Sequence, residues 1–149
     1  MSTAIDHLKT WGVSFQRPEG EQVSLPNDIT DISSEELGQL FTKLTAWTDY
    51  IESQLTLAQL EERSALKKKD FAETTALVKR MGAQAKGETV TAIKAEISID
   101  PKIVELDTDY EEKYAYRKLV EMMLTNHERD LSLVSREITR RSNDAKRSF

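Results

Sequence analysis

Residues 33–58 read SSEELGQLFTKLTAWTDYIESQLTLA, and this stretch decides the fold class. Its first four residues match a capping box: the Ser33 hydroxyl can accept a hydrogen bond from the Glu36 amide, and the Glu36 carboxylate can accept one from the Ser33 amide. Ile32 and Leu37 occupy the two positions of a hydrophobic staple. Acidic residues in the first turn also complement the helix dipole. A helix is therefore predicted to begin at residue 34.

Apolar residues follow at steps of three and four, which is the spacing of one helix face. They are Leu37, Leu40, Phe41, Leu44, Trp47, Ile51, Leu55 and Ala58. No proline interrupts residues 27–100, so helix A is predicted over about 34–86, with Gly87 as its stop and Gly82 as an earlier candidate. An uninterrupted helix of that length measures roughly 80 Å. A break near residues 64–70 is the main alternative.

The segment after this helix is predicted to be an extended link over residues 95–107. Apolar residues alternate around Pro101, and a proline disfavours helical geometry at the residue before it, here Asp100. Such a link can be a short strand or a crossover that returns the chain along helix A.

A second long helix, helix B, is predicted over about 108–141, because Thr108 and Glu111 form another capping box. Its apolar stripe repeats with the period of a helix and consists of Tyr116, Val120, Leu124, His127, Leu131, Val134 and Ile138. The remaining residues, 142–149, are predicted to form a basic tail. The packing contacts are expected from Leu44, Trp47 and Ile51 on helix A and from Val120, Leu124 and Leu131 on helix B.

The expected fold is mainly α, a helical hairpin of two long helices joined by an extended crossover and preceded by an N-terminal arm. The arm comprises residues 1–32, where glycine and proline recur too often for a long helix, although a short helix over about 3–11 is compatible with the sequence. It is expected to pack over a neighbouring surface or to stay mobile. The helical domain comprises residues 33–149.

The composition predicts an oligomer. Only 38% of the residues are hydrophobic and 32% are charged. Two helices with one apolar stripe each cannot enclose a thick core, so the remaining apolar area is expected to be buried between subunits of a homo-oligomer. No apolar run approaches the length of a membrane span, and the first residues do not match a signal peptide. A cytoplasmic location without a membrane partner is therefore expected.

The sequence contains no pattern typical of an enzyme. There is no cysteine, which excludes a thiolate metal site and a cysteine nucleophile. The two histidines, His7 and His127, have no histidine partner at helical spacing. All five glycines are isolated, so no phosphate-binding loop is present. No catalytic residue, metal or cofactor is expected, and His127 on its apolar stripe is interpreted as a core residue.

Charge is strongly segregated along the chain, although the net charge is −5. Residues 63–94 carry eight Lys and Arg against three Asp and Glu, whereas residues 1–62 carry three against eleven. On one continuous helix Lys68, Lys79 and Lys86 would fall within about 20° of one line. Such a row can follow the phosphates of a nucleic acid without reading its sequence. A solvated helix face is the alternative interpretation of the same residues.

A second basic face is predicted on helix B. Arg129, Arg136 and Arg140 lie opposite the apolar stripe, and Arg141 extends the charge toward the tail. A protein or nucleic-acid contact is favoured there over a membrane surface, because no tryptophan or phenylalanine anchors this helix. The predicted nucleic-acid-binding residues are Lys67, Lys68, Lys69, Lys79, Arg80, Lys86, Arg136, Arg140 and Arg141.

Three stretches resemble the UvsY-type recombination mediator proteins of tailed phages. Residues 97–108, ISIDPKIVELDT, are similar to the segment that leads into the C-terminal helix of that family. Residues 133–141, LVSREITRR, resemble its final amphipathic helix, and residues 65–71, ALKKKDF, resemble the basic DNA-binding element of its long helix. The order of long helix, basic patch, link and C-terminal helix also fits.

The resemblance implies a non-enzymatic, ring-forming protein of the bacterial host cytoplasm. Such a protein binds single-stranded DNA, helps to remove a single-strand-binding protein and loads a RecA-like recombinase. The alternative hypothesis is a helical structural or scaffold protein, of the virion type, whose basic residues meet acidic protein partners. The two hypotheses differ in whether the basic residues gather on an exposed surface.

Overall fold

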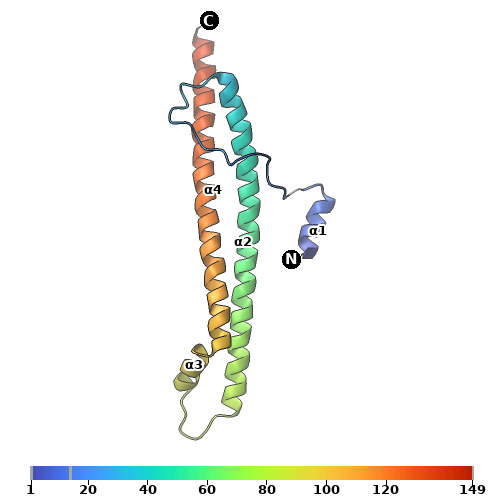
Figure 1. Cartoon of the computed structure of the whole chain (residues 1–149), viewed down its shortest axis with the longest axis vertical. Helices are drawn as coiled ribbons and strands as arrows, with labels where there is room; N and C mark the ends of the chain where they lie inside the picture. Colours follow the sequence, from blue (N-terminus) through green and yellow to red (C-terminus); the bar gives the residue numbers. More distant parts are fainter. Residues whose placement is uncertain (1, 14, 149) are drawn as a thin grey trace. The chain divides into compact units, whose positions relative to one another are not determined.

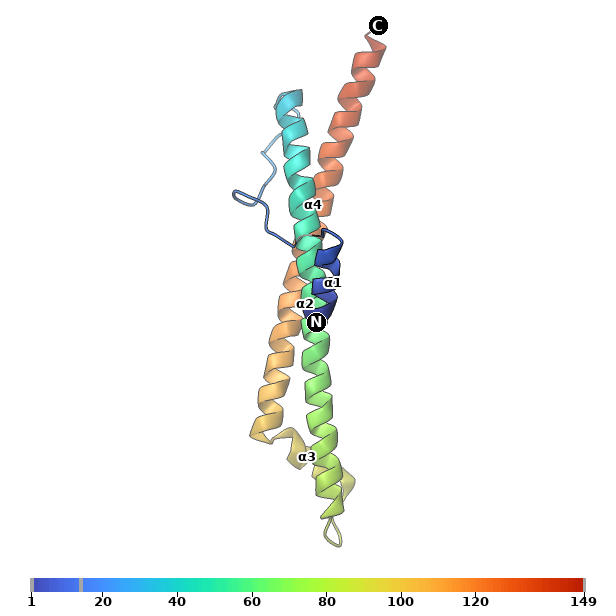
Figure 2. The same cartoon turned by 90° about the vertical axis from the view of Figure 1, so that its right-hand side faces the viewer.

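The computed structural model describes residues 2–13 and 15–148, which are mainly helical. The helices are α1 (Ser2–Thr10), α2 (Ser34–Gly82), α3 (Val90–Ser98) and α4 (Pro101–Arg147) (Figure 1). The described part of the chain contains no strand. It divides into two units, unit 1 with residues 1–56 and 119–149 and unit 2 with residues 57–118. Within each unit α2 and α4 lie side by side and antiparallel (Figures 1 and 2).

The start of α2 confirms the predicted capping box. The Glu36 amide donates to Ser33 Oγ over 3.1 Å, and the Ser33 amide donates to Glu36 Oε2 over 3.2 Å. The helix continues through residues 64–70, so the alternative of a break there is wrong. It ends at Gly82 rather than at residue 86. Glycine is a poor helix former, and a turn follows in which Gly87 has a φ of +92°, a value that glycine adopts without strain.

The predicted extended link at residues 95–107 is wrong, because this segment is helical. It contains the end of α3 and the start of α4. Pro101 is the first residue of α4, where the missing amide costs no hydrogen bond and the fixed φ suits a helix. Asp100 caps this helix, since its carboxylate accepts from the Lys102 amide over 2.9 Å. The same proline that argued for extended geometry therefore starts a helix.

The other predicted ends of the second long helix also need correction. It begins at Pro101, so the capping box predicted at Thr108 does not exist, and the Thr108 hydroxyl donates to the Val104 carbonyl inside the helix. It continues to Arg147, so most of the predicted basic tail, residues 142–147, is helical. A helix end within a run of polar residues carries few stop signals, which explains the error.

Buried residues on the two long helices recur every seven positions. Leu37, Leu44, Ile51, Ala58 and Ala65 are buried along α2, and Val120, His127 and Val134 are buried along α4. A seven-residue repeat is the spacing by which two helices keep the same seam in contact in a left-handed coiled coil. The predicted contacts Leu44, Trp47, Ile51 and Val120 are buried, and Leu124 and Leu131 are half-buried.

The arm packs on its own chain. Its apolar residues Val23, Leu25, Ile29 and Ile32 lie against the buried cluster of Leu37, Leu44 and Val134 in unit 1. Arg17 also places its guanidinium over the Trp47 ring, 5.2 Å from the ring centre. The short helix expected near residues 3–11 is present as α1. The arm thus thickens a core that two helices alone would leave open on one side.

Unit 2 has a thinner and more polar interior than unit 1. Its buried apolar residues are Ala58, Ala65, Ile93 and Ile103. Between the long helices Arg117 Nε donates to Glu62 Oε2 over 2.7 Å, and hydrogen bonding from Arg117 lowers the pKa of Glu62. Alanine buries little area, so in unit 2 ion pairs take over part of the role that large apolar side chains have in unit 1.

We expect Leu44→Ala to lower the free energy of unfolding by about 2–5 kcal/mol, because it removes a fully buried side chain and leaves a cavity. Urea denaturation followed by circular dichroism measures the loss. The matched control is Leu60→Ala on the same helix, where the side chain is exposed and the loss should stay below about 1 kcal/mol. Equal losses for the two variants would contradict the packing described here.

Candidate nucleic-acid interface

His127, the residue that most resembled a catalytic or metal-binding group, is fixed inside unit 1. Its Nδ1 lies 2.9 Å from the Met123 carbonyl oxygen, and its Nε2 lies 3.2 Å from Nε2 of the Gln22 side chain. The carbonyl can only accept, so Nδ1 carries the hydrogen and Nε2 accepts from Gln22. Across residues 2–13 and 15–148, no group of three or more His, Cys, Asp or Glu side chains is placed to hold a metal ion. His127 is therefore a core residue that ties the arm to α4.

Three predicted cations are exposed on α2 in unit 2. Lys67, Lys68 and Lys79 form no ion pair with any described residue, and all three are solvent-exposed. Lys68 and Lys79 are eleven residues apart, which places them about 20° apart around the helix and roughly 16 Å apart along it. Their ammonium groups are available to an anion from outside the chain.

Phe71 lies among these lysines and is exposed over 75% of its surface. It follows Lys67 by four residues and Lys68 by three, so the three side chains are neighbours on the helix surface. Together, Lys67, Lys68, Phe71 and Lys79 occupy about a third of the helix circumference. We name these four residues the α2 basic face.

Lys69 differs from its two neighbours because it is engaged within the chain. Its ammonium group lies 2.6 Å from Asp107 Oδ1 and 5.6 Å from the centre of the Tyr110 ring. Hydrogen bonding to Asp107 raises the pKa of Lys69. This lysine joins α2 to α4 and is not part of the exposed set.

Arg80 organises the turn that follows α2. Its guanidinium donates to Glu96 over 3.1 Å, to Glu88, and to the Ala83 carbonyl. Because α2 ends at Gly82, Lys86 lies in this turn and not on the helix. The predicted single line through Lys68, Lys79 and Lys86 is therefore wrong, although Lys86 is exposed at the turn.

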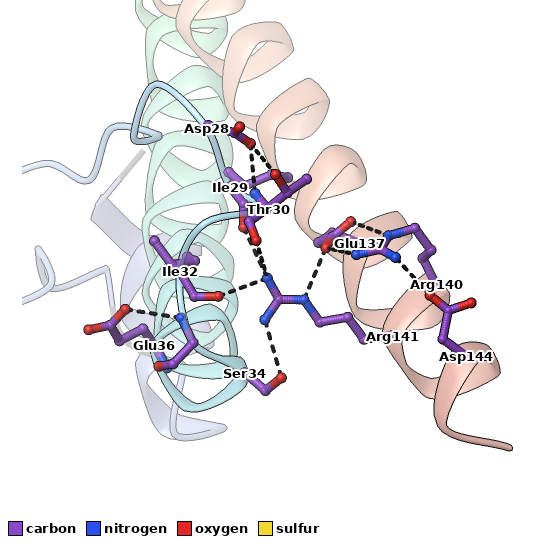
Figure 3. A network of polar contacts seen from close by, with 11 residues as sticks. Asp28, Ile29, Thr30, Ile32, Ser34, Glu36, Glu137, Arg140, Arg141 and Asp144 are labelled. Carbon is purple, nitrogen blue, oxygen red and sulfur yellow. Dashed lines mark hydrogen bonds and ion pairs between the residues drawn. The ribbon is translucent and has the colours of Figure 1, made fainter. Parts of the chain in front are cut away.

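Of the three predicted nucleic-acid-binding residues on α4, two bind the same carboxylate (Figure 3). Arg140 donates to both oxygens of Glu137, at 2.9 Å and 2.7 Å, and Arg141 donates to Oε1 at 3.0 Å. The Glu137 side chain is only 8% exposed. Hydrogen bonds from Arg140 and then from Arg141 lower the pKa of Glu137 to about 2. This pair of arginines is therefore neutralised in part by a buried acid.

Arg141 also anchors the arm (Figure 3). One of its terminal nitrogens donates to the carbonyls of Ile29, Thr30 and Ile32, and the other donates to Ser34 Oγ. These acceptors lie in the segment that enters α2. The guanidinium thus satisfies backbone carbonyls that no helix or strand would satisfy. Its role is structural.

The structure thus separates the nine predicted cations into two groups. Lys67, Lys68, Lys79, Lys86 and Arg136 are exposed and form no ion pair among the described residues, whereas Lys69, Arg80, Arg140 and Arg141 bind acidic groups of the same chain. The spacing of Glu137 from Arg140 and Arg141, three and four residues, is a signal that sequence reasoning missed. The other two engaged cations bind acids on later helices or in the turn, which no local spacing reveals.

Comparison of the chain with protein-family models, with curated proteins and with solved structures finds no match. In residues 2–13 and 15–148 no helix has the length and apolar character needed to cross a membrane.

The Glu137 cluster predicts acid sensitivity of the fold. A carboxylate whose pKa is lowered on folding stabilises the folded state above its unfolded pKa of about 4.5 and loses this effect as pH falls through the folded value of about 2. We expect Glu137→Gln to be less stable than the wild type at pH 7, with a difference that narrows between pH 5 and pH 2. Urea denaturation at several pH values measures this difference.

The control for this prediction is the same substitution in an Arg140→Ala/Arg141→Ala background. The two arginines that lower the pKa of Glu137 are absent in this background. The difference in stability between Glu and Gln at position 137 should therefore change little with pH. A wild-type-to-Gln difference that stays constant from pH 7 to pH 3 would show that the ion pairs do not govern the stability of this cluster.

Proposed function

We propose that this protein binds single-stranded DNA through the α2 basic face and acts as a non-enzymatic recombination mediator. The observation that carries the proposal is Phe71, exposed over 75% of its surface, with Lys67 and Lys68 one helical turn before it and Lys79 two turns after it. An exposed phenyl ring offers a face on which an unpaired base can stack. The surrounding lysines indicate an anionic partner.

The chemistry of this face suits a single strand. Proteins that bind single strands without sequence preference combine cations along the backbone with aromatic rings on which bases stack. A phenyl ring on the convex surface of a helix can reach an unpaired base, whereas the bases of a duplex are already stacked on each other. Lysine ammonium groups bind phosphates as point charges, so this contact carries no sequence information.

The net charge of −5 does not oppose this function. The nearest acids on α2, Asp70 and Glu73, lie about 100° or more from Phe71 around the helix. Lys68 and Lys79 lie about 120° or more from both acids around the helix, whereas Lys67 is three residues before Asp70 and is its neighbour on the helix surface. The engaged cations Lys69 and Arg80 are not required for this function.

The mediator role rests on the resemblance of residues 65–71, 97–108 and 133–141 to UvsY-type proteins. Under this proposal the protein binds single-stranded DNA in the bacterial host cytoplasm, helps to displace a single-strand-binding protein and assists loading of a RecA-like recombinase. Faster recombinase assembly on DNA covered by single-strand-binding protein would support this role. DNA binding without such an effect would leave a simple DNA-binding protein.

We expect the triple variant Lys67→Ala/Lys68→Ala/Lys79→Ala to bind every single-stranded sequence more weakly than the wild type by a similar factor. The slope of log K against log salt should flatten by about 2, since each lost phosphate contact removes roughly 0.7. Fluorescence anisotropy of labelled oligonucleotides at several salt concentrations measures both quantities. Folding should survive, because exposed charges contribute little to stability.

The matched control is Lys43→Ala/Lys102→Ala/Lys146→Ala, which removes the same charge from exposed positions outside the face. An equal decrease of the salt slope in the control variant would show that DNA binding depends on the net charge and not on the α2 basic face. If wild-type protein has no affinity for single-stranded DNA even at low salt, the proposal fails and the scaffold function takes its place.

Phe71→Ala is expected to weaken binding without changing the salt slope. The loss of one stacked base costs about 1–3 kcal/mol, or roughly 5- to 150-fold in affinity. Phe71→Trp should retain the affinity, because an indole ring also stacks. Val78→Ala, which truncates another exposed apolar side chain on α2, is the control and should bind like the wild type. Equal affinities of Phe71→Ala and Val78→Ala would exclude stacking on Phe71.

A further inference from the structure

The outward side of α4 in unit 1 carries large apolar side chains between arginines. Leu119, Met122 and Leu133 are exposed over 58%, 54% and 44% of their surfaces. Arg129 and Arg136 lie between and beside them, and both are exposed. Met122, Arg129, Leu133 and Arg136 fall within about 40° of one line along the helix. We name these five residues the α4 outer face.

This face cannot fold into the interior of its own chain. The opposite side of α4 carries Val120, His127 and Val134, which are already buried against α2 and the arm. No acidic residue of α4 between 119 and 136 falls within about 40° of the line through Met122. Neither arginine forms an ion pair with a described residue. Apolar area and unbalanced positive charge therefore remain together on the surface.

The outward side of α2 in the same unit has the complementary character. Glu35, Gly38, Thr42, Ala46 and Asp49 are exposed and fall within about 40° of one line. A β-carbon built on Gly38 meets no atom within 4 Å, so the surface there is open. The two acids form no ion pair with a described residue, and no Lys or Arg lies on the line. We name these five residues the α2 acidic face.

We propose that the α4 outer face of one copy of this chain docks on the α2 acidic face of a second copy. The charges are opposite, so an arginine of one face can pair with an acid of the other face across the contact. The sizes also fit, because large Leu and Met side chains of one helix can fill the space that small residues such as Gly38 and Ala46 leave on the facing helix. The contact buries the exposed leucines and methionine that a monomer leaves in water.

Such a contact is heterologous, since it joins two different faces. Each copy keeps one face free after the first contact, so assembly continues until it closes as a ring or extends as a filament. The inference goes beyond DNA binding, and it does not depend on it. The two faces belong to unit 1, whereas the α2 basic face belongs to unit 2 and shares no residue with either.

Two charge-reversed variants test this contact. Arg129→Glu/Arg136→Glu makes the α4 outer face acidic, and Glu35→Lys/Asp49→Lys makes the α2 acidic face basic. We expect each variant alone to sediment as a monomer at concentrations at which the wild type assembles. An equimolar mixture should assemble again, because each face then finds a face of opposite charge. The fourfold variant, with both faces reversed, should assemble by itself for the same reason.

Recovery in the mixture also shows that both variants are folded. Lys43→Glu/Lys146→Glu reverses two exposed charges outside the faces and should assemble like the wild type. A wild type that stays monomeric at micromolar concentration overturns the proposal, as does an Arg129→Glu/Arg136→Glu variant that assembles normally or a mixture that does not recover.

The DNA affinity of the same variants distinguishes the assembly contact from DNA binding by the α2 basic face. Under the assembly proposal, Arg129→Glu/Arg136→Glu should lose no more affinity per subunit than Lys43→Glu/Lys146→Glu, which changes the net charge equally. If it loses DNA binding but still assembles, the α4 outer face contacts nucleic acid and the assembly proposal is wrong. Loss of assembly with retained DNA binding supports the contact and leaves the function of the α2 basic face unchanged.

Discussion

The seam between α2 and α4 is the constraint on which the surfaces of this protein depend. Leu37, Leu44 and Ile51 are buried along α2 at seven-residue intervals, and Val120, His127 and Val134 are buried along α4 in the same way. Once these positions face inward, the helical period decides which side chains face outward. Phe71 and Met122 are exposed, like the cations beside them, because they lie on the sides of the helices that face away from the seam.

The seam contains ion pairs in unit 2, and these pairs decide which cations of that unit remain available to a ligand. In unit 2 it contains Glu62 with Arg117 and Lys69 with Asp107, where a coiled coil usually has apolar residues. Polar pairs in such positions reduce burial but favour one register over others. A lysine in the seam is used to hold the helices together, whereas its neighbours Lys67 and Lys68 remain free for a ligand.

In unit 1 the arm completes the hydrophobic core that α2 and α4 form only in part. Val23, Leu25, Ile29 and Ile32 cover the buried cluster, and Arg141 binds the carbonyls that lead into α2. Glu137 holds that guanidinium in place from the preceding turn of α4. An arginine that is saturated by backbone and carboxylate acceptors cannot also bind phosphate, which limits the basic surface of α4 to residues such as Arg129 and Arg136.

The sequence by itself determined the helical class, the start of α2 at its capping box, and the packing positions Leu44, Trp47, Ile51 and Val120. These features depend on residues within one or two turns of each other, so local spacing contains them. It did not determine whether Pro101 breaks or starts a helix, because a proline disfavours helical geometry at the residue before it and also suits the first position of a helix. Only the tertiary structure decided that Lys69 and Arg80 are engaged and that Arg141 binds backbone carbonyls of the arm. The acids that bind Lys69 and Arg80, and the carbonyls that bind Arg141, come from distant segments, and only folding brings them within hydrogen-bonding distance.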